Sequence, residues 1–161
     1  LHRLGFVYKK PKGVPGRSVK DEQKRFARKY RRMRKFLGKN DRIYFADAAY
    51  PTFNTTLACG WIKKGEEKCV PTNSGRHRLN LHGAYDPIHH QTICLLEDSV
   101  NSESTIRLLN EIARVNGKKG RIFVIVDGAS YYASKAVIRH AKELGIKLVT
   151  LPAYSPNLNL I

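Results

Sequence analysis

Two aspartates, Asp47 and Asp127, occupy positions where a carboxylate has an unusual setting. Asp47 lies within an apolar stretch, between Ala46 and Ala48, and Asp127 follows the most apolar run of the chain. A buried carboxylate is costly unless it is paired or binds a metal, and ligands of α/β proteins gather at the carboxyl ends of strands. If their strands are neighbours, the two side chains can share Mg²⁺, which prefers oxygen ligands. Two such ions can stabilise the attacking and the leaving oxygen of a phosphoryl displacement, provided that a third acid or an equivalent ligand is present.

Each aspartate also has an ordinary structural interpretation. Asp127 can be a turn residue or a helix-capping acid, because Gly128 follows it. Asp47 can accept hydrogen bonds from backbone N–H groups. Taken singly, neither residue decides between these interpretations and metal binding; the pair favours a metal site.

Hydrophobic spacing predicts the helices that frame these residues. Phe26, Tyr30, Met33 and Leu37 recur at helical intervals, which predicts a basic helix over residues 19–37 that ends at Gly38. Two further helices are expected over about 103–115 and 134–144, closed by glycines.

Strand-like segments lie before and between the two later helices. Short alternating or apolar runs predict an antiparallel meander with strands over 42–48, 56–62, 67–72, 78–85 and 91–96. The nearly continuous apolar runs 121–127 and 146–151 are typical of strands covered on both faces. The order predicts an α/β fold, with a mixed sheet and helices on its faces. Trp61 is expected to pack at a turn.

The charge balance indicates a polyanionic partner. The 161 residues hold 30 Lys and Arg against 13 Asp and Glu, a net charge of +17. Residues 1–42 carry 16 of these cations against 3 acids, so the excess is concentrated in an N-terminal basic segment. Nucleic acid is the usual partner of such a chain. No run of 18 apolar residues is present, so we expect no membrane span.

Cysteine usage favours a reducing compartment. Cys59, Cys69 and Cys94 are odd in number and lack CxxC spacing, which argues against a disulfide framework. A zinc site formed by His82, His89 or His90 with a cysteine fits no known ligand spacing, so we expect hydrogen-bonded histidines instead.

Several motifs of the chain together resemble those of one known family. The chain ends in LPAYSPNLNLI, and Tyr44–Thr52 reads YFADAAYPT. These segments resemble the LPPYSPxLNPIE motif and the first-aspartate strand of mariner-like bacterial insertion-sequence transposases of the DDE superfamily. Val126–Ala129 (VDGA) resembles the second-aspartate turn. Further matches are the GWIKKG turn from Gly60, the central hairpin from Asn73 and Leu4–Pro11 (LGFVYKKP), which resembles the tail of the winged DNA-binding region. Six motifs in order form a specific signal.

The resemblance implies an RNase H-like fold, an antiparallel three-strand meander followed by parallel strands, over residues 19–161. Asp47 and Asp127 would be the first two acids of the DDE triad and would bind Mg²⁺ or Mn²⁺. The third acid, a glutamate, is expected directly after Ile161, where the sequence ends, so we expect the chain alone to have little cleavage activity. Gly128 and Leu160 stand where the family usually has Asn and Pro.

The resemblance also implies a substrate and partners. Transposon-end and target DNA would be cut and joined, typically at a TA dinucleotide, by a homodimer in the cytoplasm near the bacterial nucleoid. Residues 1–18 would be a basic linker after helix-turn-helix modules that precede Leu1, so that the chain is a core truncated at both ends. The expected DNA contacts are Lys9, Lys10, Lys12, Arg28, Arg32, Arg76, Arg78 and Tyr131. Two alternatives are a non-catalytic DNA-binding protein derived from a transposase and, less favoured by the motifs, a nuclease acting on RNA hybrids.

Overall fold

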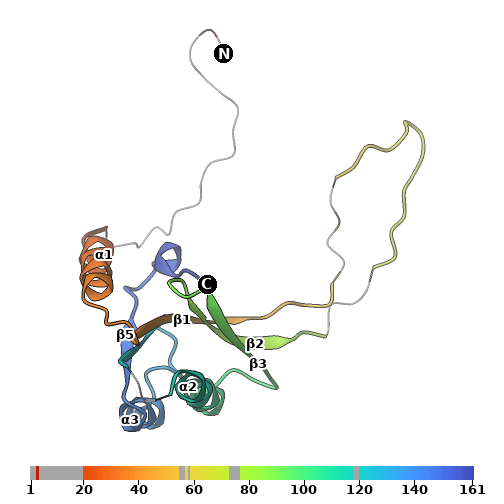
Figure 1. The fold of residues 1–161 in the computed structure, drawn as a ribbon. Helices are drawn as coiled ribbons and strands as arrows, with labels where there is room; N and C mark the ends of the chain where they lie inside the picture. Colours follow the sequence, from red (N-terminus) through yellow and green to blue (C-terminus); the bar gives the residue numbers. More distant parts are fainter. Residues whose placement is uncertain (1–2, 4–19, 55–56, 58, 73–76, 118–119) are drawn as a thin grey trace.

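A mixed five-stranded sheet forms the centre of the computed structural model, which describes residues 3, 20–54, 57, 59–72, 77–117 and 120–161 (Figure 1). The strand order is β3-β2-β1-β4-β5. β1, β2 and β3 pair antiparallel, whereas β4 and β5 join β1 in parallel. The strands span Arg42–Ala49 (β1), Asn80–Asp86 (β2), Gln91–Glu97 (β3), Ile122–Val126 (β4) and Ile146–Thr150 (β5). This is the predicted RNase H-like arrangement.

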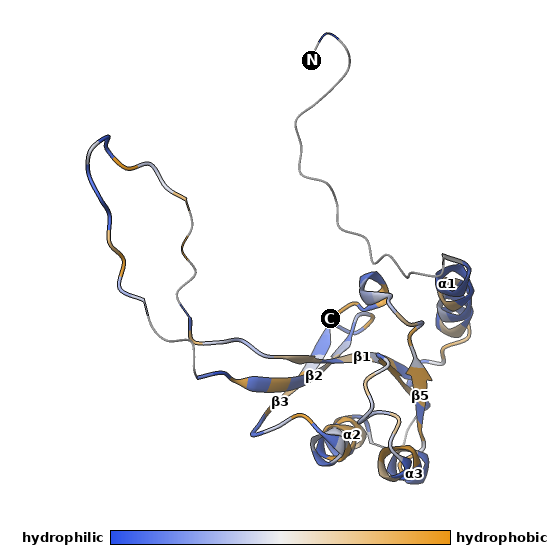
Figure 2. Ribbon diagram, turned by 180° about the vertical axis from the view of Figure 1, so that it is seen from behind, coloured by the Kyte–Doolittle hydropathy of each residue, from blue (hydrophilic) through white to orange (hydrophobic). Residues whose placement is uncertain are grey.

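Two helices, α2 (Ser102–Asn116) and α3 (Lys135–Glu143), cover one face of the sheet. Tyr44 and Ala46 of β1 face them, as do alternate residues of β4. The resulting core contains Leu108, Leu109 and Ile112 of α2. Hydrophobic residues colour β5 and much of β1 in Figure 2, as expected for strands buried between helices.

The basic helix α1 (Lys20–Lys35) covers the opposite face. Phe26 packs with Ile43 and Phe45 of β1 and Ile125 of β4 in a second core. The Tyr30 ring meets the Phe45 ring edge-on at 5.5 Å between centroids. The predicted apolar stripe of this helix is therefore confirmed as core contact, and β1 and β4 contribute to both cores.

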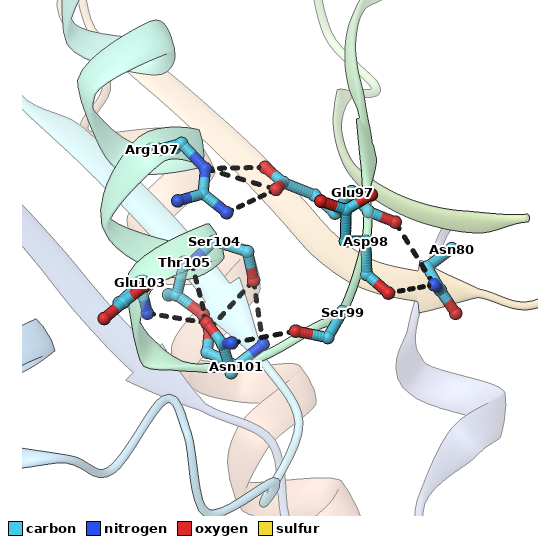
Figure 3. A network of polar contacts seen from close by, with 9 residues as sticks. All are labelled: Asn80, Glu97, Asp98, Ser99, Asn101, Glu103, Ser104, Thr105 and Arg107. Carbon is cyan, nitrogen blue, oxygen red and sulfur yellow. Dashed lines mark hydrogen bonds and ion pairs between the residues drawn. The ribbon is translucent and has the colours of Figure 1, made fainter.

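The junction between β3 and α2 is fixed by side-chain hydrogen bonds (Figure 3). The Asn101 side chain accepts from the N–H groups of Glu103 and Ser104, and the Ser104 hydroxyl in turn accepts from the Asn101 N–H. This capping box satisfies N–H groups that a helix N-terminus leaves unpaired. Arg107 of α2 also pairs with Glu97 at the end of β3, so the helix is held at the position where it packs on the sheet.

A second junction joins the start of β1 to the start of β4. Asp41 accepts hydrogen bonds from the backbone N–H and the guanidinium of Arg121, and from the Gly38 N–H. The Arg121 guanidinium holds the pKa of Asp41 at about 2, well below its ordinary value. At Gly120 the backbones approach so closely that an added Cβ would lie 2.1 Å from the Asn40 carbonyl oxygen.

The prediction of strands over 56–62 and 67–72 is wrong, because the described residues of these two segments form no strand. Only the turn between them, where the Glu66 N–H donates to the Lys63 carbonyl, is present. The chain leaves the sheet after β1 and returns at an isolated bridge between Thr52 and Arg78 (Figure 1). Trp61 is fully exposed rather than packed. Apolar alternation makes a strand only where another strand supplies hydrogen bonds and a face to pack on.

The other predicted elements are present, with ends shifted by a few residues. The three cysteines are free and exposed, as expected. Among the described residues, no helix is both long and apolar enough to cross a membrane.

Candidate active site

The register of the sheet brings Asp47 and Asp127 to the same level. β1 and β4 are adjacent and parallel, and Phe45 is paired with Ile125. Each aspartate lies two residues farther along its strand direction, so both side chains emerge on the face that α1 covers. Neighbouring strands lie about 4.8 Å apart, so the carboxylates are neighbours although 80 positions separate them in the sequence.

Both oxygens of Asp47 are held by hydrogen bonds. Oδ1 accepts from the Ala48 N–H at 2.8 Å, and Oδ2 accepts from the Asn159 side-chain amide at 2.9 Å. Burial raises the pKa of Asp47 above its ordinary value, the Asp127 charge raises it further, and the two hydrogen bonds oppose the shift. The pair of carboxylates therefore repel each other in a half-buried position, a cost that a bound cation would offset.

Asp127 begins the turn that leads into α3. Its Oδ1 accepts from the Ala129 N–H at 3.0 Å, as a turn-forming aspartate does. The ordinary interpretations of both aspartates are thus correct in part, because each accepts one local backbone N–H. These bonds orient the carboxylates without occupying all their lone pairs.

Asn159 was not predicted to belong to the site. It follows a short 3-10 helix (Pro156–Leu158) and is part of the final motif, where it stands between two leucines. Its amide donates to Asp47, whereas its Oδ1 is buried and has no hydrogen-bond partner among the described residues. The signal available in the sequence was this one polar residue in an apolar setting, which did not reveal the residue that it contacts.

The two aspartates and Asn159 line a single cleft of about 560 Å³. Leu151, Pro152 and Tyr154 also line it. Carboxylate and amide oxygens are the donors that Mg²⁺ and Mn²⁺ prefer, so the residues present fit such an ion. Within the described residues, no group of three or more His, Cys, Asp or Glu side chains is placed to hold a metal.

An aromatic cluster supports the turn after Asp127. The rings of Tyr131 and Tyr132 lie 4.7 Å apart between centroids, and the Tyr132 hydroxyl is 2.8 Å from His82 Nε2 in the core. Burial, together with the charges of Asp127 and Asp47, raises the pKa of Tyr131 to about 12. Tyr131 therefore lies beside the carboxylates as a neutral phenol.

The other predicted DNA contacts fall into three groups. Arg28 and Arg32 are exposed on α1. Arg78 is exposed beside the sheet, with its guanidinium carbon 5.3 Å from the centre of the Tyr50 ring. The remaining four lie outside the described residues: Lys9, Lys10, Lys12 and Arg76.

The histidines behave as expected of structural residues. His82 pairs with Tyr132, His89 with Asp86, and His90 with Tyr85. Burial lowers the pKa of His82 to about 4, so this ring is neutral in the core at pH 7.

Comparison with known proteins places this geometry among related sequences and folds. The family model described as "DDE superfamily endonuclease" matches residues 42–161, which include all five strands. A search of curated proteins found no significant match.

Solved structures with a similar fold include the Mos1 transposase in a paired-end complex with the left transposon end, at 19% identity and a TM-score of 0.71. That match covers 98% of this chain and 50% of the other, so the chain spans about half the length of the Mos1 protein. The Mos1 mariner paired-end complex with Mn matches at 21% identity, with a TM-score of 0.69 and coverage of 99% and 51%. A simian T-cell lymphotropic virus intasome in complex with the PP2A regulatory subunit B56 gamma matches at 16% identity, with a TM-score of 0.54. That match covers 73% of this chain and 34% of the other.

Proposed function

Because the chain belongs to the DDE superfamily endonuclease family, we propose that it is the catalytic domain of a DNA transposase that cleaves and joins strands at transposon ends. The observation that carries this proposal is the convergence of Asp47 and Asp127 near the carboxyl ends of two adjacent parallel strands, in one cleft. The proposed reactions are attack of water on a phosphodiester, which releases a 3′-hydroxyl, and attack of that hydroxyl on target DNA.

Some residues of the cleft would bind the metal ion, and others orient the metal-binding carboxylates. Asp47 and Asp127 would hold Mg²⁺ or Mn²⁺, whose chemistry here is charge stabilisation at the attacking and leaving oxygens of the displacement. The Ala48 N–H and the Asn159 amide fix the plane of the Asp47 carboxylate, and the Ala129 N–H fixes Asp127. The displacement also needs a third acid or an equivalent ligand, so we expect Asp47 and Asp127 by themselves to support little cleavage.

The proposed substrate is DNA, held by cations around the cleft. Candidate contacts among the described residues are Arg28, Arg32, Arg78 and Tyr131, and the remaining four are Lys9, Lys10, Lys12 and Arg76. A homodimer that acts in the cytoplasm near the nucleoid, as part of a bacterial insertion sequence, remains a prediction.

Calorimetric titration with Mn²⁺ tests the proposed site directly. We expect the unchanged chain to bind the ion, and Asp47→Asn and Asp127→Asn each to lose binding. Asp98→Asn, which removes an exposed carboxylate after β3, is the matched control and should bind as the unchanged chain does. Equal binding by all four proteins would overturn the metal site.

The same experiment separates the second candidate, a non-catalytic DNA-binding protein. The net charge of +17 and the exposed cations of α1 favour DNA binding with or without catalysis. DNA binding by a folded chain that binds no Mn²⁺ would support this second candidate.

A further inference from the structure

Basic side chains follow one side of α1, next to its apolar face. Their spacing is that of a helical stripe, with intervals of three and four residues. Beside this stripe, one more lysine is exposed at the start of β5. We call the set of five the cationic track: Arg25, Arg28, Lys29, Arg32 and Lys147.

The track lines two hollows that lead to the candidate active site. Arg28, Lys29, Arg32 and Lys147 line a hollow of about 650 Å³ near the beginnings of β4 and β5. Arg25 and Lys29 line a smaller hollow of about 290 Å³. Lys29 lines both, so the two hollows lie on either side of this residue.

The smaller hollow adjoins the cleft that contains the carboxylates. Leu151 and Pro152 line both of them. Cations therefore line the surface along α1 from the hollow next to this cleft to the start of β5. The stripe from Arg25 to Arg32 spans about 10 Å at the rise of an α-helix.

The charges of the track are unbalanced within the part of the chain that the structure describes. None of its five members forms an ion pair there, whereas Lys24, one turn before Arg28, lies 4.0 Å from Asp21. Arg121, which also lines the larger hollow, is paired with Asp41. Glu22 is the one acid that lines either hollow. Like charges three and four positions apart destabilise a helix, so the track is costly without a polyanion.

We propose that the cationic track binds the phosphate backbone of a DNA strand whose reacting phosphodiester lies between Asp47 and Asp127. The proposal rests on the proposed function for the position of that phosphodiester, and it adds the direction in which the strand leaves the cleft. A row of cations in an extended groove matches the regular charges of a backbone better than a single small anion. Lysine and arginine contacts of this kind position DNA without reading its sequence.

Paired charge-removal variants test the track. Arg28→Gln/Arg32→Gln removes two track cations, and Arg31→Gln/Arg34→Gln removes two exposed cations from another side of the same helix. Binding of a fluorescent random-sequence duplex would be measured by anisotropy across salt concentrations, with EDTA present. Losing two phosphate contacts should reduce the slope of log K against log salt by about 1.8 and weaken binding at 0.1 M salt between about ten- and a hundredfold. Equal slopes for the two variants would overturn the proposal.

Lysine footprinting gives an independent readout that needs no variant. Acetylation with and without the duplex, read by mass spectrometry, should show protection of Lys29 and Lys147 but not of Lys142, which is exposed on α3 over the other face of the sheet. Equal acetylation of all three lysines in the presence of bound DNA would contradict the track.

The two proposals fail separately. If the aspartate variants lose Mn²⁺ while the track lysines stay unprotected, the track is wrong and the proposed function stands. If the lysines are protected and the chain binds no Mn²⁺, the track binds DNA but the proposed catalytic site is wrong. Thermal unfolding of both double variants checks that the fold is intact.

Discussion

The side-chain amide of Asn159 donates a hydrogen bond to Asp47 Oδ2 across 2.9 Å, joining two residues 112 positions apart in the chain. This bond leaves the Asn159 carbonyl oxygen buried without a donor among the described residues. The orientation of Asp47 therefore depends on the last motif of the sequence as well as on β1.

Replacement of Asn159 by alanine should weaken Mn²⁺ binding about ten- to a hundredfold, the usual effect of removing a hydrogen bond that orients a ligand. Calorimetry measures the change. Asn157→Ala, at an exposed position two residues earlier, should bind as the unchanged chain does. If both variants bind equally well, Asn159 does not orient the metal ligand.

His82 should make the fold sensitive to mild acid. Its pKa is about 4 in the folded chain against an ordinary 6.5, so below pH 6.5 the unfolded chain takes up a proton that the folded chain does not. The free energy of unfolding should fall by about 1.4 kcal/mol per pH unit from this group alone, until the pH nears 4. Urea unfolding between pH 7 and 4 measures the slope.

A His82→Gln variant removes this titration and should flatten the slope in that range, whatever its stability at pH 7. His90→Gln, at an exposed position, is the control and should keep the slope. An unchanged slope in the His82 variant would show that this ring is not the group responsible.

Asp41 should stabilise the fold by about 1–2 kcal/mol at neutral pH through its contacts with Arg121. The pKa is lowered from 3.8 to about 2 on folding, so the contribution is complete above pH 4 and disappears as the pH falls toward 2. Urea unfolding of Asp41→Asn should show that loss at pH 7 and converge with the unchanged chain near pH 2. A constant difference at every pH would point to a cause other than the charge.

The close approach at Gly120 predicts a severe effect of the smallest side chain. An added Cβ would lie 2.1 Å from the Asn40 carbonyl oxygen, so the backbones must separate and strain the contacts of Asp41 nearby. Gly120→Ala should lower the free energy of unfolding by more than about 2 kcal/mol. Gly60→Ala has open space around it and should be neutral. Denaturant unfolding compares the two.

Local patterns predicted the parts of the fold that they determine physically. The apolar run before Asp127 marks a strand buried on both faces, and the stripe through Phe26 marks a helix on a core. The alternating pattern did not reveal that Trp61 is exposed, because the pattern of one segment does not show whether a neighbouring strand packs against it.

The candidate site was predictable to a similar extent. Strand ends and buried carboxylates identify Asp47 and Asp127 from their own surroundings. That the two carboxylates lie side by side depends on the register between β1 and β4. The contact between Asn159 and Asp47 depends on how the final segment packs against the sheet. Neither of these long-range features can be recognised from a local sequence pattern.

The sharing of β1 and β4 between two cores has a consequence for local unfolding. We expect amide protons of these central strands to exchange slowly, because both layers protect them, whereas α1 belongs to one layer and can detach in a smaller opening. Asp47 within β1 and Asp127 directly after β4 are then held by the best-protected strands, and the helix beside them can detach without separating the two carboxylates.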